Sequence, residues 1–260
     1  MVTIASWNVN SVKARLPHLL EWLEAYSPDI VLLQELKCEE KSFPRDEIEN
    51  LGYNIAGHYQ KTYNGVAILS KHPIEDVSTI LSNDPDPLQS RYIEAVITIG
   101  TKAFRVASVY VPNGGEVDSQ KFFYKLAFLE ALISHAKILA AYNEALIIGG
   151  DFNVALEEID NFSSDETDVL FDPRERRLLH KFMHIGFHDS FRTLNPSSTE
   201  YSWWDYRANS FNRNLGVRID YLFVSHLAAD MLLHASIDRE MRAKERPSDH
   251  VPVICELALK

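Results

Sequence analysis

The chain has 260 residues, of which 46% are hydrophobic, and it carries a formal net charge of −11. This composition excludes disordered, collagen-like and low-complexity chains, and the acidic balance argues mildly against a general polyanion binder. No apolar run approaches the roughly eighteen residues that a membrane span needs. The two cysteines, Cys38 and Cys255, form no CxxC pair, so we expect free thiols in a reducing cytosol.

The first part of the chain predicts a strand, a helix and a second strand. The N-terminus enters the first strand at once, with no signal-peptide or transit-peptide pattern, and this strand ends near Asn8. Residues 11–26 carry leucines at helical spacing. The apolar run "IVLLQE" (30–35) then predicts a buried strand that ends at Glu35.

Three strand-like runs and a long helix follow. Residues 64–71 and 91–100 predict strands, and the alternation in the second suits a half-buried antiparallel strand. Residues 101–110 pair with it through a short turn. An amphipathic helix is expected over 119–142, before the strand "LIIGGDFN" (146–153), which ends in an acid, an aromatic residue and an amide.

The last part of the chain predicts one more helix and two strands. The helix covers 173–186, with Asp172 as its N-cap. Strands are expected at 218–225 and 251–259. Hairpins and helix crossovers in one chain predict an α/β fold with two sheets covered by helices, and we interpret 1–260 as one domain.

Polar side chains collect at the ends of these strands. Taken singly, most of them fit a turn or a helix cap. Asp220 does not, because an acid within "VRIDYLFV" is buried and needs a partner. The set is too large for independent turn chemistry: Asn8, Glu35, Tyr110, Asn113, Asp151, Asn153, Asp220, Asp249 and His250.

This set of side chains favours phosphate-ester hydrolysis. Carboxylate and amide oxygens are the ligands that Mg²⁺ or Mn²⁺ prefers. A carboxylate beside His250 would fix its tautomer and favour the imidazolium, and a tyrosine can donate to a phosphate oxygen. No Walker loop is present.

Two other features have simpler interpretations. His180, His184 and His188 recur every four residues, but Gly186 ends the helix and no HExxH acid accompanies them, so surface histidines are expected rather than a zinc site. The acidic segment 157–171 is interpreted as a solvated loop.

A series of motifs resembles one family. In order they are "SWNVNSVKARL", "DIVLLQELK", "GYNIAGHYQKTYNGVAILSK", "VASVYVPNG", "LIIGGDFNVA", "YSWWDYR", "NLGVRIDYLFVS" and "PSDHVPV". They closely resemble the exonuclease III family of apurinic/apyrimidinic (AP) endonucleases, within the endonuclease/exonuclease/phosphatase superfamily. The resemblance spans essentially the whole chain and implies a four-layered α/β sandwich of two packed mixed sheets flanked by helices.

The resemblance also implies roles for the polar residues. Glu35 resembles the main Mg²⁺ ligand, Asp151 the residue that orients or deprotonates the attacking water, and Asn153 a stabiliser of the attack geometry. The implied metal set is Asn8, Glu35, Asp151, Asn153 and Asp249. The implied catalytic set is Tyr110, Asp151, Asn153, Asp220 and His250, in which Asp220 partners His250, His250 contacts the scissile phosphate and Tyr110 belongs to the phosphate pocket.

The implied DNA contacts form a third set. Arg91, Asn113 and Lys121 match DNA-contacting positions, and Trp203, Val217 and Ile219 match positions that line an abasic-sugar pocket. Trp203 fits either the pocket wall or plain core, whereas we assign Trp204 to the core.

The activity that the resemblance implies is Mg²⁺-dependent hydrolysis, with Mn²⁺ as a substitute, of the phosphodiester 5′ to abasic sites in duplex DNA. It is accompanied by 3′→5′ exonuclease and 3′-phosphatase action. A monomer is expected, in a bacterial-type cytoplasm and associated with the nucleoid through DNA.

Two departures from the family pattern leave alternatives open. Val217 stands where some relatives carry a large aromatic residue, and Glu116 stands near a basic residue that enters the duplex in some relatives. The protein could therefore be predominantly a 3′→5′ exonuclease with weak AP endonuclease activity. Another phosphoesterase of the superfamily, such as a sphingomyelinase or an inositol-phosphate phosphatase, and a non-catalytic nucleic-acid-binding regulator are further alternatives.

Overall fold

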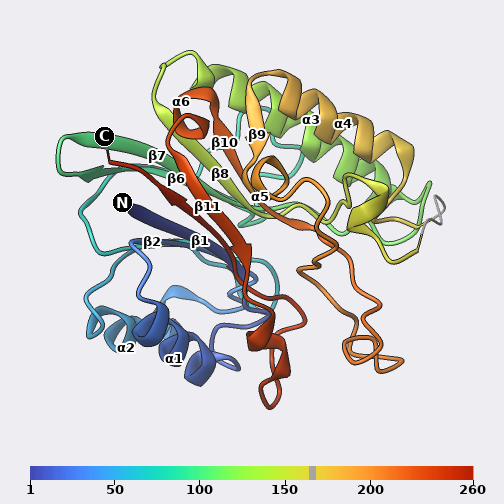
Figure 1. Cartoon of the computed structure of the whole chain (residues 1–260), viewed down its shortest axis with the longest axis horizontal. Coiled ribbons are helices and arrows are strands. Elements are labelled where there is room, and N and C mark those ends of the chain that lie inside the picture. The colour runs from blue at the N-terminus through green and yellow to red at the C-terminus, as the bar shows by residue number, and fades with distance from the viewer. Residues whose placement is uncertain (164–167, 260) are drawn as a thin grey trace.

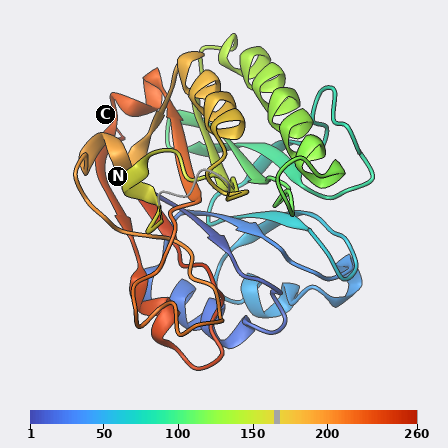
Figure 2. The same ribbon diagram turned by 90° about the vertical axis from the view of Figure 1, so that its right-hand side faces the viewer.

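Two β-sheets packed face to face form the centre of the molecule (Figure 1). The structure is a computed structural model that describes residues 1–163 and 168–259. Each sheet has six strands and mixes parallel with antiparallel pairs. Helices cover the two outer faces, as the turned view in Figure 2 shows. The predicted four-layered α/β sandwich is confirmed.

The first sheet contains both chain ends. Its β1 strand pairs in parallel with β2 and antiparallel with β12. In spatial order its strands are β11 (Leu232–Ile237), β12 (Val253–Leu257), β1 (Val2–Asn8), β2 (Ile30–Gln34), β4 (Val66–Ser70) and β3 (Asn54–His58).

The second sheet also has a parallel strand pair flanked by an antiparallel strand. Its β7 strand pairs in parallel with β8, and β10 lies antiparallel to β8. In spatial order its strands are β5 (Ile74–Ser78), β6 (Tyr92–Ile99), β7 (Lys102–Tyr110), β8 (Ala145–Asp151), β10 (Asp220–Ser225) and β9 (Phe187–Asp189).

The helices form the outer layers. In Figure 1, α1 and α2 lie below the first sheet, and α3 and α4 lie above the second. No helix of the described residues is long and apolar enough to cross a membrane. The helices are α1 (Leu16–Tyr26), α2 (Arg45–Glu49), α3 (Gln120–Ala140), α4 (Pro173–His184), α5 (Ser190–Leu194) and α6 (His226–Ala229), with short 3₁₀ turns η1 (Glu40–Ser42), η2 (Glu158–Asp160) and η3 (Arg239–Ala243).

Several element boundaries differ from the prediction. The first helix begins at Leu16 rather than near residue 11, because Asn10 and Ser11 have φ values of 44° and 87° that are incompatible with a helix. Strands β3, β5, β9 and β11 were not predicted, and β3 and β5 contain no fully buried residue. A strand with little burial lacks the apolar alternation on which sequence reasoning depends.

The core between the sheets brings the two halves of the site together. Leu32 and Ile68 of the first sheet and Ile147 and Leu222 of the second are fully or almost fully buried in one cluster. This shared core supports the single-domain interpretation of residues 1–260, which stays a prediction. Cys38 and Cys255 are buried and free, as predicted.

The topology directs polar strand ends to one edge of the sandwich. Because β1 and β2 are parallel, Asn8 and the residue after Gln34 lie at the same edge. The parallel pair β7–β8 places Tyr110 opposite Asp151 at the corresponding edge of the second sheet. The antiparallel strand β10 begins there, with Asp220 directly opposite Asp151.

Gly150 allows this edge to form. Its φ is 155°, and a Cβ atom there would overlap the backbone carbonyl oxygen of Val109 on the neighbouring strand. We therefore expect Gly150→Ala to lower the free energy of unfolding by about 1–3 kcal/mol, through backbone strain and overpacking. Urea denaturation would measure this, with Gly52→Ala as the control, because Gly52 also has a positive φ (86°) but a Cβ there meets open space, so the difference between the two variants isolates the overlap with Val109. Equal stability loss in the two variants would contradict the expectation.

Candidate active site

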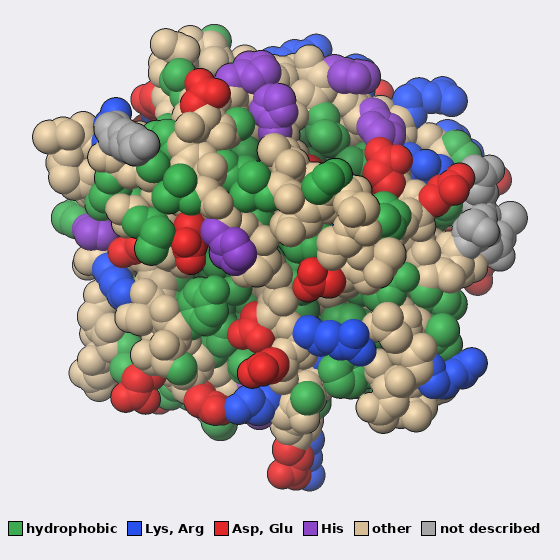
Figure 3. Space-filling model, in the orientation of Figure 1, with side chains coloured by type: hydrophobic (Ala, Val, Ile, Leu, Met, Phe, Trp, Pro, Cys, Tyr) green, Lys and Arg blue, Asp and Glu red, His purple; other side chains and the backbone are tan. Residues whose placement is uncertain are grey.

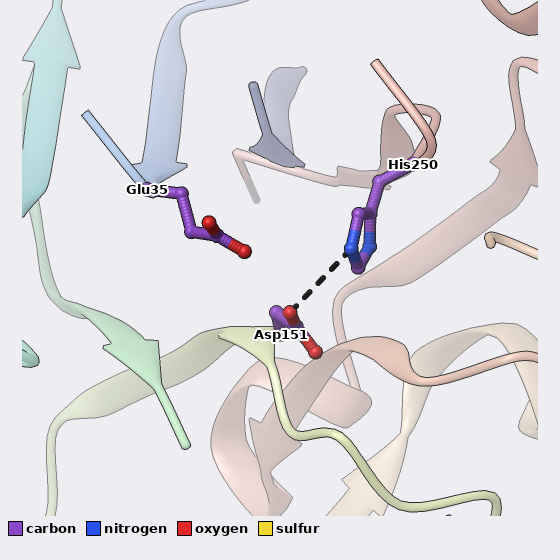
Figure 4. Close-up of side chains that lie close together, drawn as sticks. All are labelled: Glu35, Asp151 and His250. Atoms are coloured by element: carbon purple, nitrogen blue, oxygen red, sulfur yellow. Dashed lines mark ion pairs between the residues drawn. The ribbon is translucent and has the colours of Figure 1, made fainter. Parts of the chain in front are cut away.

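Three side chains from both sheets converge at the common edge. Glu35, Asp151 and His250 each offer a ligand atom, and these atoms lie within 4.8 Å of one another. Figure 4 shows the three side chains pointing toward one another, with an ion pair of 3.6 Å between His250 Nε2 and Asp151 Oδ2. The sequence placed all three at strand ends, and the fold brings them together.

Asn8 bridges the two sheets inside this cluster. Its buried Nδ2 donates to Glu35 Oε1 and to Asp151 Oδ2, each at 2.9 Å. The side-chain Oδ1 accepts the backbone N–H of Asn10 at 2.9 Å, which fixes the orientation of the amide. Asn8 therefore holds the two carboxylates at a set separation.

Glu35 occupies an unusual backbone conformation immediately after β2. Its φ of 54° lies in the left-handed region, which is costly for a residue with a side chain. The backbone N–H of Ser11 donates to Glu35 O at 2.7 Å, and Lys37 Nζ lies 2.6 Å from Glu35 Oε2. Neighbouring groups thus hold both the backbone and the side chain of Glu35.

Asp249 connects to the cluster through a chain of contacts rather than directly. Its Oδ1 accepts from Asn10 Nδ2 at 2.8 Å and its Oδ2 accepts from Trp203 Nε1 at 3.0 Å. Lys37 Nζ donates to Asn10 Oδ1 at 2.5 Å and also pairs with Glu35. Burial raises the pKa of Asp249, but the charge of His250 and the hydrogen bonds from Trp203 and Asn10 outweigh burial and hold this pKa below its usual value.

Asp151 is buried among other charges. Burial is the main cause that raises its pKa to about 7; the positive charge of His250 opposes this, and Asp220 and Glu35 add to it. Its Oδ1 accepts the backbone N–H of Asn153 at 2.9 Å. A carboxylate with a pKa near neutrality is suited to accept a proton from water.

Asn153 is the second residue of the site with a left-handed backbone, at a φ of 52°. Its Nδ2 donates to Val111 O at 2.9 Å and lies 3.3 Å from Asp151 Oδ2, and its Oδ1 accepts from Asn113 Nδ2 at 3.1 Å. These bonds fix the amide beside Asp151.

His250 forms a buried dyad with Asp220. Its Nδ1 lies 2.9 Å from Asp220 Oδ2, which also accepts from Ser202 Oγ at 2.6 Å. Burial alone would lower the pKa of His250, but the charges of Asp220 and Asp151 outweigh burial and raise it to about 10. The dyad therefore presents an imidazolium whose Nε2 faces Asp151.

A cavity of about 740 Å³ opens beside the cluster. The predicted pocket residues Trp203, Val217 and Ile219 line it, and Trp203 pairs with both Val217 and His250 through isolated β-bridges. Trp204 is buried in the core, as predicted. The sequence did not predict the further apolar wall residues, which are Phe162, Val169, Leu170, Ala208 and Leu215.

The other predicted DNA contacts line a second hollow of about 350 Å³. Arg91, Asn113 and Lys121 all lie there, together with Tyr110, which both hollows share. The Arg91 guanidinium lies 4.7 Å from the centre of the Tyr110 ring, so Arg91 packs on the ring face. Burial is the main cause that raises the pKa of Tyr110, which keeps its phenol a proton donor.

The interpretation of 157–171 as a solvated loop is wrong for much of its described part. Asp160 is fully buried and accepts from Arg218 Nε at 2.8 Å and Nη2 at 2.9 Å, while Arg218 Nη1 donates to Asp189 Oδ2 at 2.7 Å. Arg218 lies two residues before Asp220, so this network anchors the strand that carries the dyad. Residues 164–167 lie outside the described part of the chain.

The recurrent histidines lie away from the cluster. His180 lies 3.7 Å from Glu157, and His188 contacts His226 at 2.8 Å. Figure 3 shows histidine side chains near the upper part of this face, over the region of α4 and α6. Within the described residues, Glu35, Asp151 and His250 form the cluster of acidic and histidine side chains that lie close enough together to hold a metal ion.

The donor set of the cluster fits a hard divalent cation. Glu35 and Asp151 supply carboxylate oxygens, and their mutual repulsion helps to raise the pKa of Asp151. A cation between them would relieve this repulsion. Asp220 holds His250 as an imidazolium, which has no free lone pair for a metal ion. His250 therefore balances the charge of Asp151 rather than binding the cation.

Comparisons with known proteins agree with this geometry. A model described as the Endonuclease/Exonuclease/phosphatase family matches residues 5–250. The chain is 34% identical over 262 residues to exodeoxyribonuclease III of Haemophilus influenzae, covering 96% of this chain and 98% of that protein. The chain therefore belongs to the endonuclease/exonuclease/phosphatase family.

Two solved structures resemble the whole chain. An AP endonuclease from Archaeoglobus fulgidus is 35% identical with a TM-score of 0.94, and the match covers 100% of both chains. The 3′ phosphatase NExo from Neisseria, solved with a product DNA hairpin, is 37% identical with a TM-score of 0.95, covering 99% of this chain and 100% of that one.

The His250–Asp220 dyad makes a prediction about protonation. In protein freed of metal with a chelator, we expect His250 to stay protonated above about pH 8, whereas an ordinary histidine titrates near 6.5. Because the pKa of His250 is raised in the folded state, its protonation stabilises the fold. This contribution to the free energy of unfolding is complete below about pH 6.5 and is lost as the pH rises toward about 10. Histidine NMR titration would measure this pKa, and His250→Gln would identify the resonance. Asp220→Asn should lower the pKa; a wild-type His250 that titrates near pH 6.5 would contradict the assignment.

Proposed function

We propose that this protein is a metal-dependent DNA-repair nuclease that hydrolyses the phosphodiester 5′ to abasic sites in duplex DNA and also removes 3′-terminal nucleotides and 3′-phosphates. The observation that carries the proposal is that the Glu35–Asp151–His250 cluster lines a cavity with a partly apolar wall, and that this cavity adjoins, through Tyr110 and Asn113, the hollow lined by Arg91 and Lys121. Its relatives carry the names of an exodeoxyribonuclease, an AP endonuclease and a 3′ phosphatase.

In this proposal Asp151 acts on the attacking water. Its carboxylate, buried at the centre of the cluster, is placed to take a proton as the water oxygen forms a bond to phosphorus. The bond between phosphorus and the 3′-oxygen then breaks, and that oxygen takes up a proton from water and leaves as a 3′-hydroxyl. Asn153, fixed beside Asp151, orients the water for in-line attack.

The remaining groups stabilise the charge that develops on phosphate. The His250 imidazolium has its Nε2 directed into the site, and the Tyr110 hydroxyl is available as a second donor. Donors that are already oriented stabilise the transition state without reorganisation. Asp220 and Ser202 hold the imidazole ring in place.

The proposed cofactor is Mg²⁺, with Mn²⁺ as a substitute. Glu35 and Asp151 would hold it, with Asn8 and Asn153 supporting them and Asp249 linked to Glu35 through Asn10 and Lys37. When bound, such an ion supplies Lewis-acid stabilisation of the phosphoryl oxygens.

The cavity suggests what distinguishes the substrate. An abasic sugar leaves the duplex stack at low cost, and apolar walls such as Trp203, Val217 and Ile219 would receive it. A predominantly 3′→5′ exonuclease is the second candidate, because exposed Glu116 near the hollow would be repelled by DNA phosphates. A monomeric state and association with the nucleoid stay predictions.

Three labelled duplexes test the proposal side by side. They carry an internal abasic-site analogue, an intact recessed 3′ end and a 3′-phosphate, and each is incubated with Mg²⁺ or with chelator. We expect Mg²⁺-dependent incision 5′ to the analogue and removal of the 3′-phosphate, with Asp151→Asn losing about 10³-fold or more of each rate but keeping DNA affinity within a few-fold.

The control for this assay is Asp230→Asn, which changes an exposed acid beyond α6 and should retain full activity. Degradation of the recessed 3′ end alone would favour the exonuclease candidate. Failure to cleave any of the three duplexes would refute the proposed function and direct attention to other phosphate esters.

Lys121 tests the second hollow as a DNA contact. It is exposed at the start of α3, so we expect Lys121→Ala to weaken duplex binding and to reduce the slope of log K against log salt by about 1. Fluorescence anisotropy across a salt series would measure both quantities. The matched control is Lys137→Ala in the last turn of the same helix; an equal effect of the two substitutions would contradict a specific contact at Lys121.

A further inference from the structure

Lys125 is a fully buried cation immediately behind the active site. Its side chain has no exposed surface, although it lies on α3, one of the outer helices of the molecule. Its Nζ lies 2.5 Å from Glu175 Oε2, 2.6 Å from Asn153 O and 2.7 Å from Val169 O. The two backbone carbonyls accept hydrogen bonds from the ammonium group, and the Glu175 carboxylate forms an ion pair with it.

The three acceptors belong to three separate parts of the chain. Glu175 is in the first turn of α4 and is itself fully buried. Asn153 belongs to the loop after β8, and Val169 lines the main cavity. Lys125 therefore connects two helices, the catalytic loop and the cavity wall through one atom.

The contact to Asn153 falls on a strained point of the backbone. Asn153 has a φ of 52°, a conformation that costs about 1–3 kcal/mol and persists only where the surroundings impose it. Lys125 holds the carbonyl of this residue, while Asn113 and Val111 hold its side chain. The same Asn153 donates its backbone N–H to Asp151 Oδ1.

The loop carrying Asn113 also packs against this lysine. A Cβ atom at Gly114 would lie 3.0 Å from Lys125 Cδ and 2.9 Å from Val169 Cγ2. Gly114, with a φ of 95°, thus lets the Asn113 loop lie directly on the lysine stem. The positions of Asn113 and Asn153 therefore both depend on the Lys125 side chain.

Stability alone does not explain a buried ion pair. Burial lowers the pKa of Lys125 and raises the pKa of Glu175, against the attraction between the two charges, which shows the cost of keeping the charges from water. Replacing such a pair by apolar residues is often neutral or stabilising. The pair therefore points to a requirement for geometry, namely an ammonium group at the carbonyl of Asn153.

We propose that Lys125 is a positioning residue for phosphodiester hydrolysis, which fixes the left-handed backbone of Asn153 and, through it, the orientation of Asp151. It touches neither the substrate nor the reacting atoms. Glu175 keeps the ammonium group in place and balances its charge. The inference rests on the proposed nuclease function for its kinetic consequence, but its structural consequence is independent of the substrate.

The decisive variant is the double substitution Lys125→Met with Glu175→Gln. Lys125→Met alone leaves the Glu175 carboxylate buried and unpaired, which destabilises the fold, so the single variant does not separate folding from positioning. The double variant removes both charges at nearly constant volume and should fold with a thermal midpoint close to that of the wild type. Lys137→Met on the exposed end of α3 is the matched single control.

Two measurements on the double variant separate positioning from simple support. We expect kcat on the abasic-site duplex to fall about 10- to 100-fold with KM within about threefold, because a displacement of about 1 Å in a catalytic group costs this much. We also expect the side-chain amide NMR resonances of Asn153 and Asn113 to shift. A folded double variant with wild-type kcat and unshifted resonances would overturn the proposal.

The NMR readout keeps the two proposals distinguishable. If the wild-type protein cleaves none of the duplexes, the proposed function fails, and shifted resonances of Asn153 would still support the structural role of Lys125. If the wild type cleaves DNA and the double variant has normal kcat, the positioning role fails alone. A rise in KM with unchanged kcat would likewise overturn the positioning role in favour of a role in substrate binding.

Discussion

The crowding of three carboxylates, two of them buried, at one edge of the sandwich is the constraint on which the rest of the site depends. Asp151 and Asp220 are almost fully buried, and Glu35 lies within reach of them. Such charges repel one another and lose their hydration, which is why burial and both neighbours raise the pKa of Asp151. The imidazolium of His250, the ammonium of Lys37 and the amide of Asn8 offset this cost.

The site achieves its geometry through backbone strain that packed neighbours hold in place. Glu35 and Asn153 each lie just beyond a strand end and each has a left-handed φ. In both cases a bond to the carbonyl oxygen restrains the strained residue, from the Ser11 N–H and from Lys125 Nζ. Each sheet thus contributes the same arrangement to the site: a residue with a left-handed backbone follows the end of a strand, and a hydrogen-bond donor holds its carbonyl oxygen.

The parts of the site that follow apolar strands were predictable from the sequence, because a polar residue after a buried run lies at a sheet edge. Asp151 after "LIIGG" and Glu35 after "IVLLQ" are such cases. Lys125 and Arg218 were not predictable, because their burial depends on Glu175 and Asp160, far away in the chain. Asp160 in particular lies in an acidic run that by composition alone favours solvent, and only its arginine partners explain its burial.

The distribution of charge, rather than its sum, bears on how an acidic chain can act on a polyanion. Several acids are paired inside the fold: Asp160 and Asp189 with Arg218, and Glu175 with Lys125. Such pairs leave the net charge of −11 unchanged, but the cationic side chains of Arg91 and Lys121 line the hollow at the site edge. The residual acidity weakens sequence-independent binding to undamaged DNA, since that binding depends on phosphate contacts alone. An enzyme of this kind gains selectivity, because productive binding needs the local cationic contacts and the apolar cavity together.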